Sequence, residues 1–214
     1  AQKQEHSQRS RLAALKLIKT PVIILASCYS VVTFLKERGL IYTVIPLYVN
    51  LEIGLTFVEL GFLMAGRGVG ALIGTMSGGW LSDRLGRRIV LLGGFSIAAC
   101  STLLLIWARD FLSLFFVMIL NGVSTGIVVT TIPAMVADEV PPNIRGMAIG
   151  AYRTFTRMSE ILGPILLMAI VSSQGFLSSF YVMTILMLLT VSASAAVQRR
   201  NYTMPRSGKH NTPT

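Results

Sequence analysis

Six long apolar segments restrict the fold of this chain more than any other feature. They cover residues 20–50, 57–81, 89–107, 112–137, 147–172 and 177–197. A helix needs about 20 apolar residues to cross the hydrocarbon core of a bilayer. The segments lack the alternation of polar and apolar side chains that is typical of barrel strands, and helices satisfy their own backbone groups in lipid. We therefore expect an all-α membrane protein, a bundle of six transmembrane helices in a lipid bilayer.

The composition supports this fold class. Only 13% of the 214 residues are charged, whereas about 25% is usual in soluble proteins. The net charge of +10 does not indicate nucleic-acid binding, because the basic residues gather at the ends of the apolar segments and form no stripe. Residues 1–19 are expected to be a basic cytoplasmic linker or tail, either disordered or a short interfacial helix. Residues 198–214 are expected to be a disordered cytoplasmic tail.

The basic residues also predict an orientation. If both termini are cytoplasmic, 13 of the 19 Lys and Arg residues lie on the cytoplasmic side, against Arg109 alone outside and five within segments. Such an imbalance decides the topology of membrane proteins. We therefore expect a multi-pass protein of the plasma (cytoplasmic) membrane with both termini inside. The 13 residues are Lys3, Arg9, Arg11, Lys16, Lys19, Arg84, Arg87, Arg88, Arg145, Arg199, Arg200, Arg206 and Lys209.

Several polar or charged residues fall inside the apolar segments. An ionisable group at the bilayer centre costs roughly 2.5–3.5 kcal/mol on insertion scales, so it is usually paired or faces water. In the fifth segment Arg153, Arg157 and Glu160 lie within about 60° of arc on one helix face. They form either a polar wall of an aqueous cavity or an Arg157–Glu160 ion pair with Arg153 reaching towards the cytoplasm. The candidate substrate-binding or proton-coupling residues are Lys36, Glu37, Arg67, Asn121, Arg153, Arg157 and Glu160.

The first segment allows two interpretations. Tyr29, Thr33 and Lys36 share one helix face, whereas Arg38 points almost opposite Lys36 on a straight helix. The three consecutive charges at 36–38 therefore cannot all line one cavity. Alternatively, the helix ends at Leu35, which leaves a short span. In the second segment Glu59 is expected to complement the dipole of a helix N-terminus.

Glycines at every fourth position predict close contacts between helices. Gly66, Gly70, Gly74 and Gly78 form one ridge in the second segment, and Gly122 and Gly126 repeat the spacing in the fourth. In lipid such residues let two backbones approach closely. Residues 122–126 and 66–71 also match loose nucleophile-elbow and dinucleotide fingerprints, but neither has a strand before it. We therefore expect no enzyme, cofactor or metal site, and we expect Cys28 and Cys100 to be small core residues.

The most specific motif is the cationic loop between the second and third segments, Gly79-Trp80-Leu81-Ser82-Asp83-Arg84-Leu85-Gly86-Arg87-Arg88. It resembles the loop signature of the major facilitator superfamily of secondary transporters at every fixed position. Residues 138–146 are similar to that family's loop after the fourth helix, and Gly163-Pro164 is similar to the Gly-Pro of its fifth helix. The resemblance covers about residues 20–200. It implies one six-helix half of a transporter whose two halves enclose a small-molecule substrate.

The resemblance also implies a conformational latch. By position, Asp83 would lie against a helix of the other half, and Arg87 would pair with Asp138. Partly buried Arg–carboxylate pairs and anions at helix N-termini are physically favourable. The implied latch and signature residues are Gly79, Asp83, Arg84, Gly86, Arg87, Arg88, Asp138 and Arg145.

Two further questions concern the whole protein. The start at Ala1, the linker-like residues 1–19 and Met118 in place of an arginine favour the second half, whereas an intact loop signature favours the first. We expect the second half, with the other six-helix half as partner. The expected function is secondary active transport of a small solute by alternating access, with efflux favoured and proton coupling possible. The alternative is a stand-alone six-span scaffold or receptor without transport.

Overall fold

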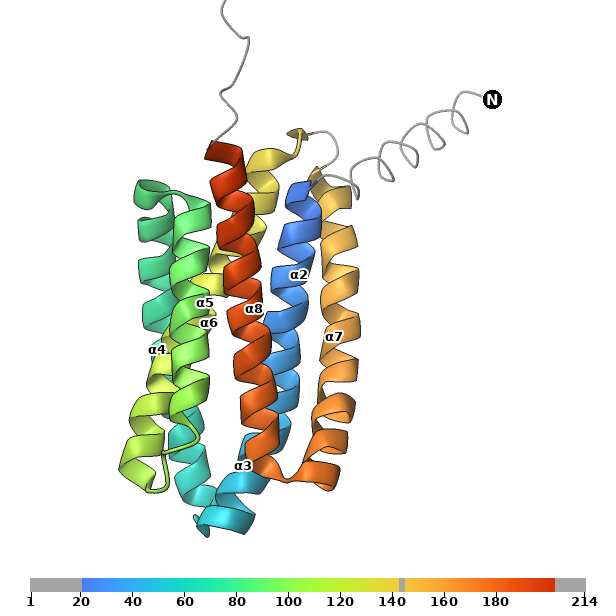
Figure 1. Cartoon of the computed structure of the whole chain (residues 1–214). Helices are drawn as coiled ribbons and strands as arrows, with labels where there is room; N and C mark the ends of the chain where they lie inside the picture. Colours follow the sequence, from blue (N-terminus) through green and yellow to red (C-terminus); the bar gives the residue numbers. More distant parts are fainter. Residues whose placement is uncertain (1–20, 143–144, 203–214) are drawn as a thin grey trace, which may run out of the picture.

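The computed structural model describes residues 21–142 and 145–202, which form six helical crossings that run up and down beside one another (Figure 1). The described residues contain no strand. The predicted fold class, an all-α six-helix membrane bundle, is therefore confirmed. The first crossing consists of α2 (Pro21–Leu35), η1 (Lys36–Val44), α3 (Ile45–Tyr48) and η2 (Val49–Ile53), and the others are α4 (Phe57–Leu85), α5 (Arg87–Leu104), α6 (Phe111–Glu139), α7 (Arg145–Gln174) and α8 (Phe176–Tyr202).

The bounds differ from the sequence expectation at several ends. Helix α8 continues to Tyr202, so residues 198–202 of the expected tail are helical. The expected linker at 1–19 and the tail at 203–214 lie outside the described residues. Five helices, α4 to α8, are long and apolar enough to cross a membrane. The first crossing differs from them because α2 ends after 15 residues, before the charges at 36–38.

The first crossing nevertheless continues as one helix, as the apolar segment at 20–50 predicted, so the alternative in which the helix ends at Leu35 was wrong. The residues at its junctions, Leu35, Ile45 and Val49, keep right-handed helical backbone angles. The segments η1 and η2 are π-helices, whose hydrogen bonds span one residue more than in an α-helix. The crossing therefore neither ends at Leu35 nor follows regular α geometry. Within η1, Lys36 and Glu37 are buried and Arg38 is exposed.

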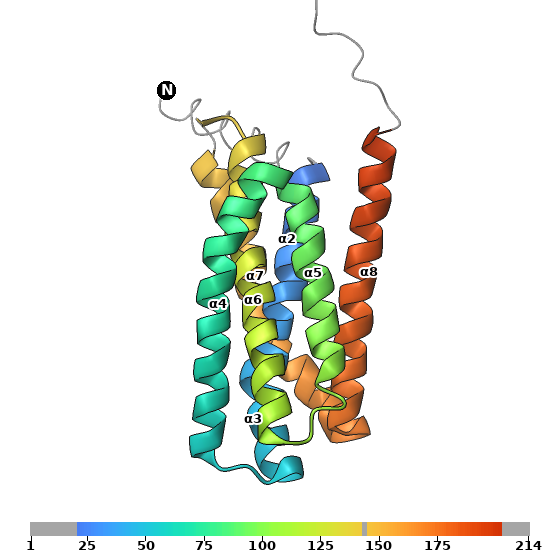
Figure 2. The ribbon, with the colours of Figure 1, turned by 90° about the vertical axis from the view of Figure 1, so that its left-hand side faces the viewer.

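The chain reversals place the cationic loop at a defined end of the bundle. The start of α2, the α4–α5 turn, the end of α6, the start of α7 and the end of α8 lie at the upper end (Figures 1 and 2). The η2–α4, α5–α6 and α7–α8 connections lie at the lower end. Gly86 makes the tight α4–α5 turn with a φ of 91°, a value that favours glycine.

Side-chain caps begin two helices at the lower end. Thr56 and Glu59 form a capping box at the start of α4, in which each side chain accepts a backbone N–H of the other residue. Glu59 thus lies at a helix N-terminus, as expected. Asp110 caps α6 by accepting the backbone N–H of Ser113 at 2.9 Å. That hydrogen bond, with a second from the Ser113 hydroxyl, lowers the pKa of the Asp110 carboxyl.

Helices α4 and α6 are in backbone contact along the glycine ridge. A Cβ on Gly70 would lie 2.2 Å from the carbonyl oxygen of Ile119, and one on Gly74 would lie 2.1 Å from that of Val123. From the other helix, a Cβ on Gly122 would lie 2.1 Å from the carbonyl oxygen of Arg67. A Cβ on Gly126 would lie 2.3 Å from the carbonyl oxygen of Ala71 and one on Gly78 would lie 2.8 Å from the Ile127 Cα, whereas one on Gly66 would meet the Phe115 ring at 2.6 Å. A comparable contact joins Gly39 of η1 to Gly163 of α7, and the sequence reading did not anticipate it.

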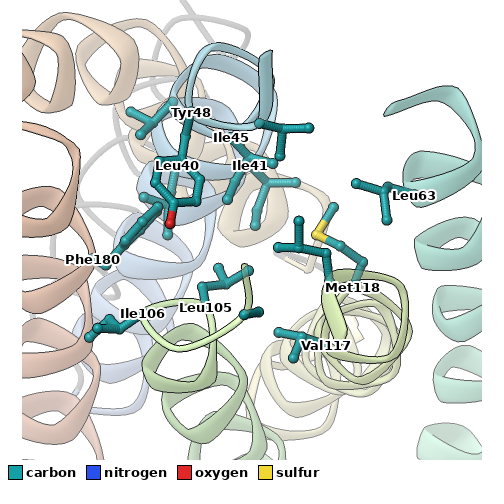
Figure 3. Close-up of a cluster of buried hydrophobic side chains, with 14 of the residues drawn as sticks. Leu40, Ile41, Ile45, Tyr48, Leu63, Leu105, Ile106, Val117, Met118 and Phe180 are labelled. Carbon is teal, nitrogen blue, oxygen red and sulfur yellow. The ribbon is translucent and has the colours of Figure 1, made fainter. Parts of the chain in front are cut away.

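Two apolar clusters fill the rest of the bundle. In one of them, side chains of η1 and α3 such as Leu40 and Ile45 meet Met118 of α6 and Phe180 of α8 (Figure 3). The other joins α2 to α5 through Tyr29 and Phe95, whose ring centroids are 4.7 Å apart. Cys28 and Cys100 belong to neither cluster. Both are exposed on the bundle, so the expectation that they are core residues was wrong: in lipid an apolar segment presents small residues outward as readily as inward.

We predict that Gly74→Ala destabilises the bundle and that Gly68→Ala does not. A methyl group at 74 meets the backbone of Val123, whereas nothing lies within 4 Å of a Cβ at 68. Overpacking typically costs about 1–3 kcal/mol, while both changes gain the same helix propensity. The measurement is the thermal unfolding midpoint of each variant in detergent. Equal midpoints for the two variants would contradict the backbone contact.

Candidate functional site

Three charged side chains meet inside the bundle, in the middle third of the first crossing and of α4. Lys36 and Glu37 come from the start of η1 and Arg67 from α4. The Lys36 Nζ lies 3.2 Å from the Glu37 Oε1, and the Arg67 guanidinium pairs with the Glu37 Oε2. All three residues are buried. We call Lys36, Glu37 and Arg67 the inner charge group; its single carboxylate is shared by two cations.

Helix α6 supplies polar partners to the inner charge group. The Thr125 hydroxyl donates to the Glu37 Oε1 at 2.9 Å and accepts from the Lys36 Nζ at 3.2 Å. The Asn121 Oδ1 accepts from the Arg67 Nε at 3.4 Å, and its Nδ2 donates to Ser101. These partners offset the desolvation of the buried charges. Asn121 was among the sequence candidates, whereas Thr125 was missed although it lies one helical turn after Asn121.

The glycine contact explains why these side chains can meet. Gly122 of α6 touches the backbone of Arg67 itself. The two helices are therefore close enough there for Arg67 to reach Asn121. On the other side, Gly39 against Gly163 brings η1 close to α7. Small residues on three helices thus hold the charged positions together.

A second set of charges lies between η1 and α7. The Arg157 Nη1 donates to the Glu160 Oε2 at 2.8 Å, and the Arg38 Nε lies 4.0 Å from the same oxygen. Arg38, Glu160 and Arg157 are called here the outer charge group. Arg157 and Glu160 thus form the ion pair that was one of the two sequence interpretations. Arg153 is exposed one turn before Arg157, and no contact joins it to either charge group.

A third cluster ties the upper ends of α4, α5 and α6. The Arg87 guanidinium lies 3.0 Å from the Asp138 Oδ2, 3.0 Å from the Asp83 Oδ1 and 2.6 Å from the Ser82 Oγ. The expected Arg87–Asp138 pair is therefore formed. Asp83 also pairs with Arg87, yet its side chain remains 69% exposed. We call Ser82, Asp83, Arg87 and Asp138 the end cluster.

The other signature residues lie on the same helix ends as the end cluster or next to them. The Arg84 guanidinium carbon lies 4.1 Å from the centroid of the Trp80 ring. Gly79 has open space around it, and Gly86 makes the turn. Arg88 lies in the first turn of α5, and Arg145 begins α7 and is exposed.

A comparison with known proteins assigns this architecture. The profile of the Major Facilitator Superfamily matches residues 5–211. The chain belongs to this superfamily. Quinolone resistance protein NorA of Staphylococcus aureus is 28% identical over 126 residues, which are 59% of this chain and 32% of NorA. Monosaccharide-sensing protein 1 of Arabidopsis thaliana is 32% identical over 99 residues, 46% of this chain and 14% of that protein.

Solved structures of Major Facilitator Superfamily transporters share the fold. The inward open xylose transporter XylE from E. coli has a TM-score of 0.64 at 20% identity, covering 82% of this chain and 47% of XylE. An auto-inhibited POT family peptide transporter has a TM-score of 0.72 at 16% identity, covering 89% of this chain and 40% of that one. The chain thus spans less than half the length of each of these relatives. Membership in this superfamily and the apolar helices identify an integral membrane protein.

We predict that Glu37→Gln lowers the thermal stability of the protein strongly. Removing one partner of a buried ion pair typically costs about 3–5 kcal/mol, and here two cations lose their shared carboxylate. Lys36→Met combined with Glu37→Gln should recover part of the loss, because one unpaired charge is then gone. Thermal unfolding of the single and double variants measures both effects. A double variant no more stable than Glu37→Gln would show that Lys36 and Glu37 do not depend on each other.

Proposed function

We propose that this chain is one six-helix half, the second, of a secondary active transporter that moves a small solute across the plasma membrane by alternating access. The observation that carries the proposal is the inner charge group, held at mid-height in a bundle of this superfamily. Charged residues within membrane helices are energetically costly, so their presence usually marks a functional site. The chain covers less than half of NorA, XylE and the peptide transporter, which supports the proposal that another six-helix half completes the transporter.

The proposal also covers the direction of transport and the ion that drives it. NorA is named for quinolone resistance, which favours export as the direction. The two cations favour the charged form of the Glu37 carboxylate, so the proposed proton coupling requires a conformation in which Lys36 and Arg67 have moved away from it. The end cluster is proposed to act as a latch, because it joins three helix ends through exposed ion pairs that can break at small cost.

The transport proposal is tested in inside-out membrane vesicles that contain the full-length protein carrying this chain. A quinolone, norfloxacin, and a cationic dye, ethidium, serve as probes, with and without an imposed pH gradient. The expected result is gradient-dependent accumulation of at least one probe above that of vesicles without the protein. Accumulation that is equal with and without the protein, for these two probes and also for the dyes fluorescein and rhodamine 123, would overturn the proposal in favour of a six-span scaffold or receptor.

We predict that Asp83→Asn slows transport several-fold and leaves the amount of protein in the membrane unchanged. The substitution removes one acceptor of Arg87 and the charge that is available to a neighbouring helix. Initial rates of probe transport, normalised to protein in the membrane, give the measurement. Glu52→Gln is the matched control, since Glu52 is an exposed carboxylate at the opposite end. Unaltered rates in Asp83→Asn would remove Asp83 from the latch.

The proposed orientation predicts which end of the bundle each reagent reaches. In a background with Cys28 and Cys100 replaced by Ser, single cysteines are placed at Leu85, the last residue of α4, and at Arg109, in the α5–α6 connection. Both residues are exposed, and these two helix ends lie at opposite ends of the bundle. A membrane-impermeant maleimide added to intact cells should label the position 109 cysteine. The position 85 cysteine should react only after permeabilisation. The reverse pattern would invert the topology.

A further inference from the structure

One aromatic ring connects the two charge groups. The Tyr42 hydroxyl accepts from the Arg67 Nη1 at 3.2 Å. The same ring has the Arg67 guanidinium carbon 5.3 Å and the Arg38 guanidinium carbon 5.4 Å from its centroid, which are cation–π distances. Tyr42 therefore joins the inner charge group, through Arg67, to the outer charge group, through Arg38. The described side chains of η1, α4 and α7 form one continuous polar network.

This network carries more positive than negative charge. Glu37 is shared by Lys36 and Arg67, and Glu160 is shared by Arg38 and Arg157. Four cations thus share two carboxylates, which leaves two positive charges without a counter-charge among the described residues. Excess cations in the middle third of membrane helices are unfavourable unless an anion or water reaches them.

The excess charge is accessible from outside the bundle. The Arg38 side chain is 47% exposed and that of Arg157 is 71% exposed, whereas Lys36 and Arg67 are almost fully buried. Tyr42 is 51% exposed. A molecule that approaches from outside the bundle would therefore contact the guanidinium groups of Arg38 and Arg157 and the ring of Tyr42. The buried Arg67 holds that ring in place. Guanidinium groups bind carboxylates and phosphates in a bidentate manner, and rings favour a flat apolar part.

We propose that the solute carried by this protein is an organic anion, whose carboxylate or phosphate contacts Arg38 and Arg157 and whose apolar part lies against Tyr42. This inference rests on the proposed transport function and names the substrate class. An acidic side chain of the other half could supply the counter-charge in place of the solute, and the experiment distinguishes the two. Arg67 acts as a positioning residue, because it holds Tyr42 and does not itself reach the solute.

The test compares two dyes that share a xanthene ring system and differ in charge. Inside-out vesicles with the full-length protein are given fluorescein, an anion, or rhodamine 123, a cation, and accumulated dye is measured after lysis at one fixed pH. We expect accumulation of fluorescein and not of rhodamine 123. Arg38→Gln and Arg157→Gln should each raise the half-saturating fluorescein concentration roughly tenfold, the loss typical of one charge-assisted contact.

Two further variants control for charge and for folding. Arg38→Lys should restore part of the affinity, because it keeps the charge but loses the two-pronged geometry. Arg109→Gln removes an exposed arginine at the lower end and should leave fluorescein transport unchanged. Protein amounts and elution profiles of all variants are compared to recognise misfolding. If Arg38→Gln is misfolded, Arg38→Lys takes its place in the comparison.

The outcomes separate this inference from the proposed function. Accumulation of rhodamine 123 without fluorescein would overturn the anion class and leave transport standing. Fluorescein accumulation that is insensitive to both arginine substitutions would also overturn it, and would favour an acidic group of the other half as the counter-charge. If norfloxacin or ethidium is transported but neither xanthene dye is, the result also contradicts the proposal that the solute is an anion. Failure of all four probes overturns the proposed function itself.

Discussion

The contact between the backbones of α4 and α6 is the constraint on which the rest of the structure depends. Five glycines (Gly70, Gly74, Gly78, Gly122 and Gly126) allow it, and adding one methyl group at Gly70, Gly74 or Gly122 would bring a carbon within about 2.2 Å of a carbonyl oxygen. At this separation Arg67 reaches Asn121 across the helix pair. The same pair brings Ser82 and Asp83 of α4 near Asp138 of α6, so that Arg87 can bridge them. Both polar clusters thus depend on small residues that carry no charge.

The interior of the bundle combines two kinds of stabilisation that respond differently to change. Apolar contacts such as those around Leu40, Met118 and Phe180 are local and tolerate substitution of similar volume. The inner charge group is not local, because Glu37 links η1, α4 and α6 through one carboxylate. Loss of one member leaves the others buried and unpaired. Stability and the proposed chemistry are therefore concentrated in the same few side chains.

Much of this structure could be predicted from the sequence, and the failures have physical causes. Apolar length predicted the helices, and spacing by four predicted the glycine contacts. The loop signature and the Arg87–Asp138 pair followed from a motif. The form of the first crossing could not be predicted, because hydropathy finds the long segment at 20–50 but cannot show that π-helical turns with buried partners accommodate the charges at 36–38. Thr125 and Tyr42 were missed for a related reason. A threonine in an apolar helix usually bonds its own backbone, and a tyrosine gives no sign of which cation it will meet.

The end cluster and the glycine contact differ greatly in how firmly they hold. Exposed ion pairs such as those of Arg87 are worth about 1 kcal/mol or less, an energy not far above that of thermal motion. Arg87 has alternative acceptors on both neighbouring helices, so the loss of one bond is compensated by another within the same cluster. The helix pair below is locked by steric fit over several turns. The upper end of the bundle is consequently held by contacts that can be exchanged one at a time, whereas the helix pair below it can separate only if several close backbone contacts are lost together.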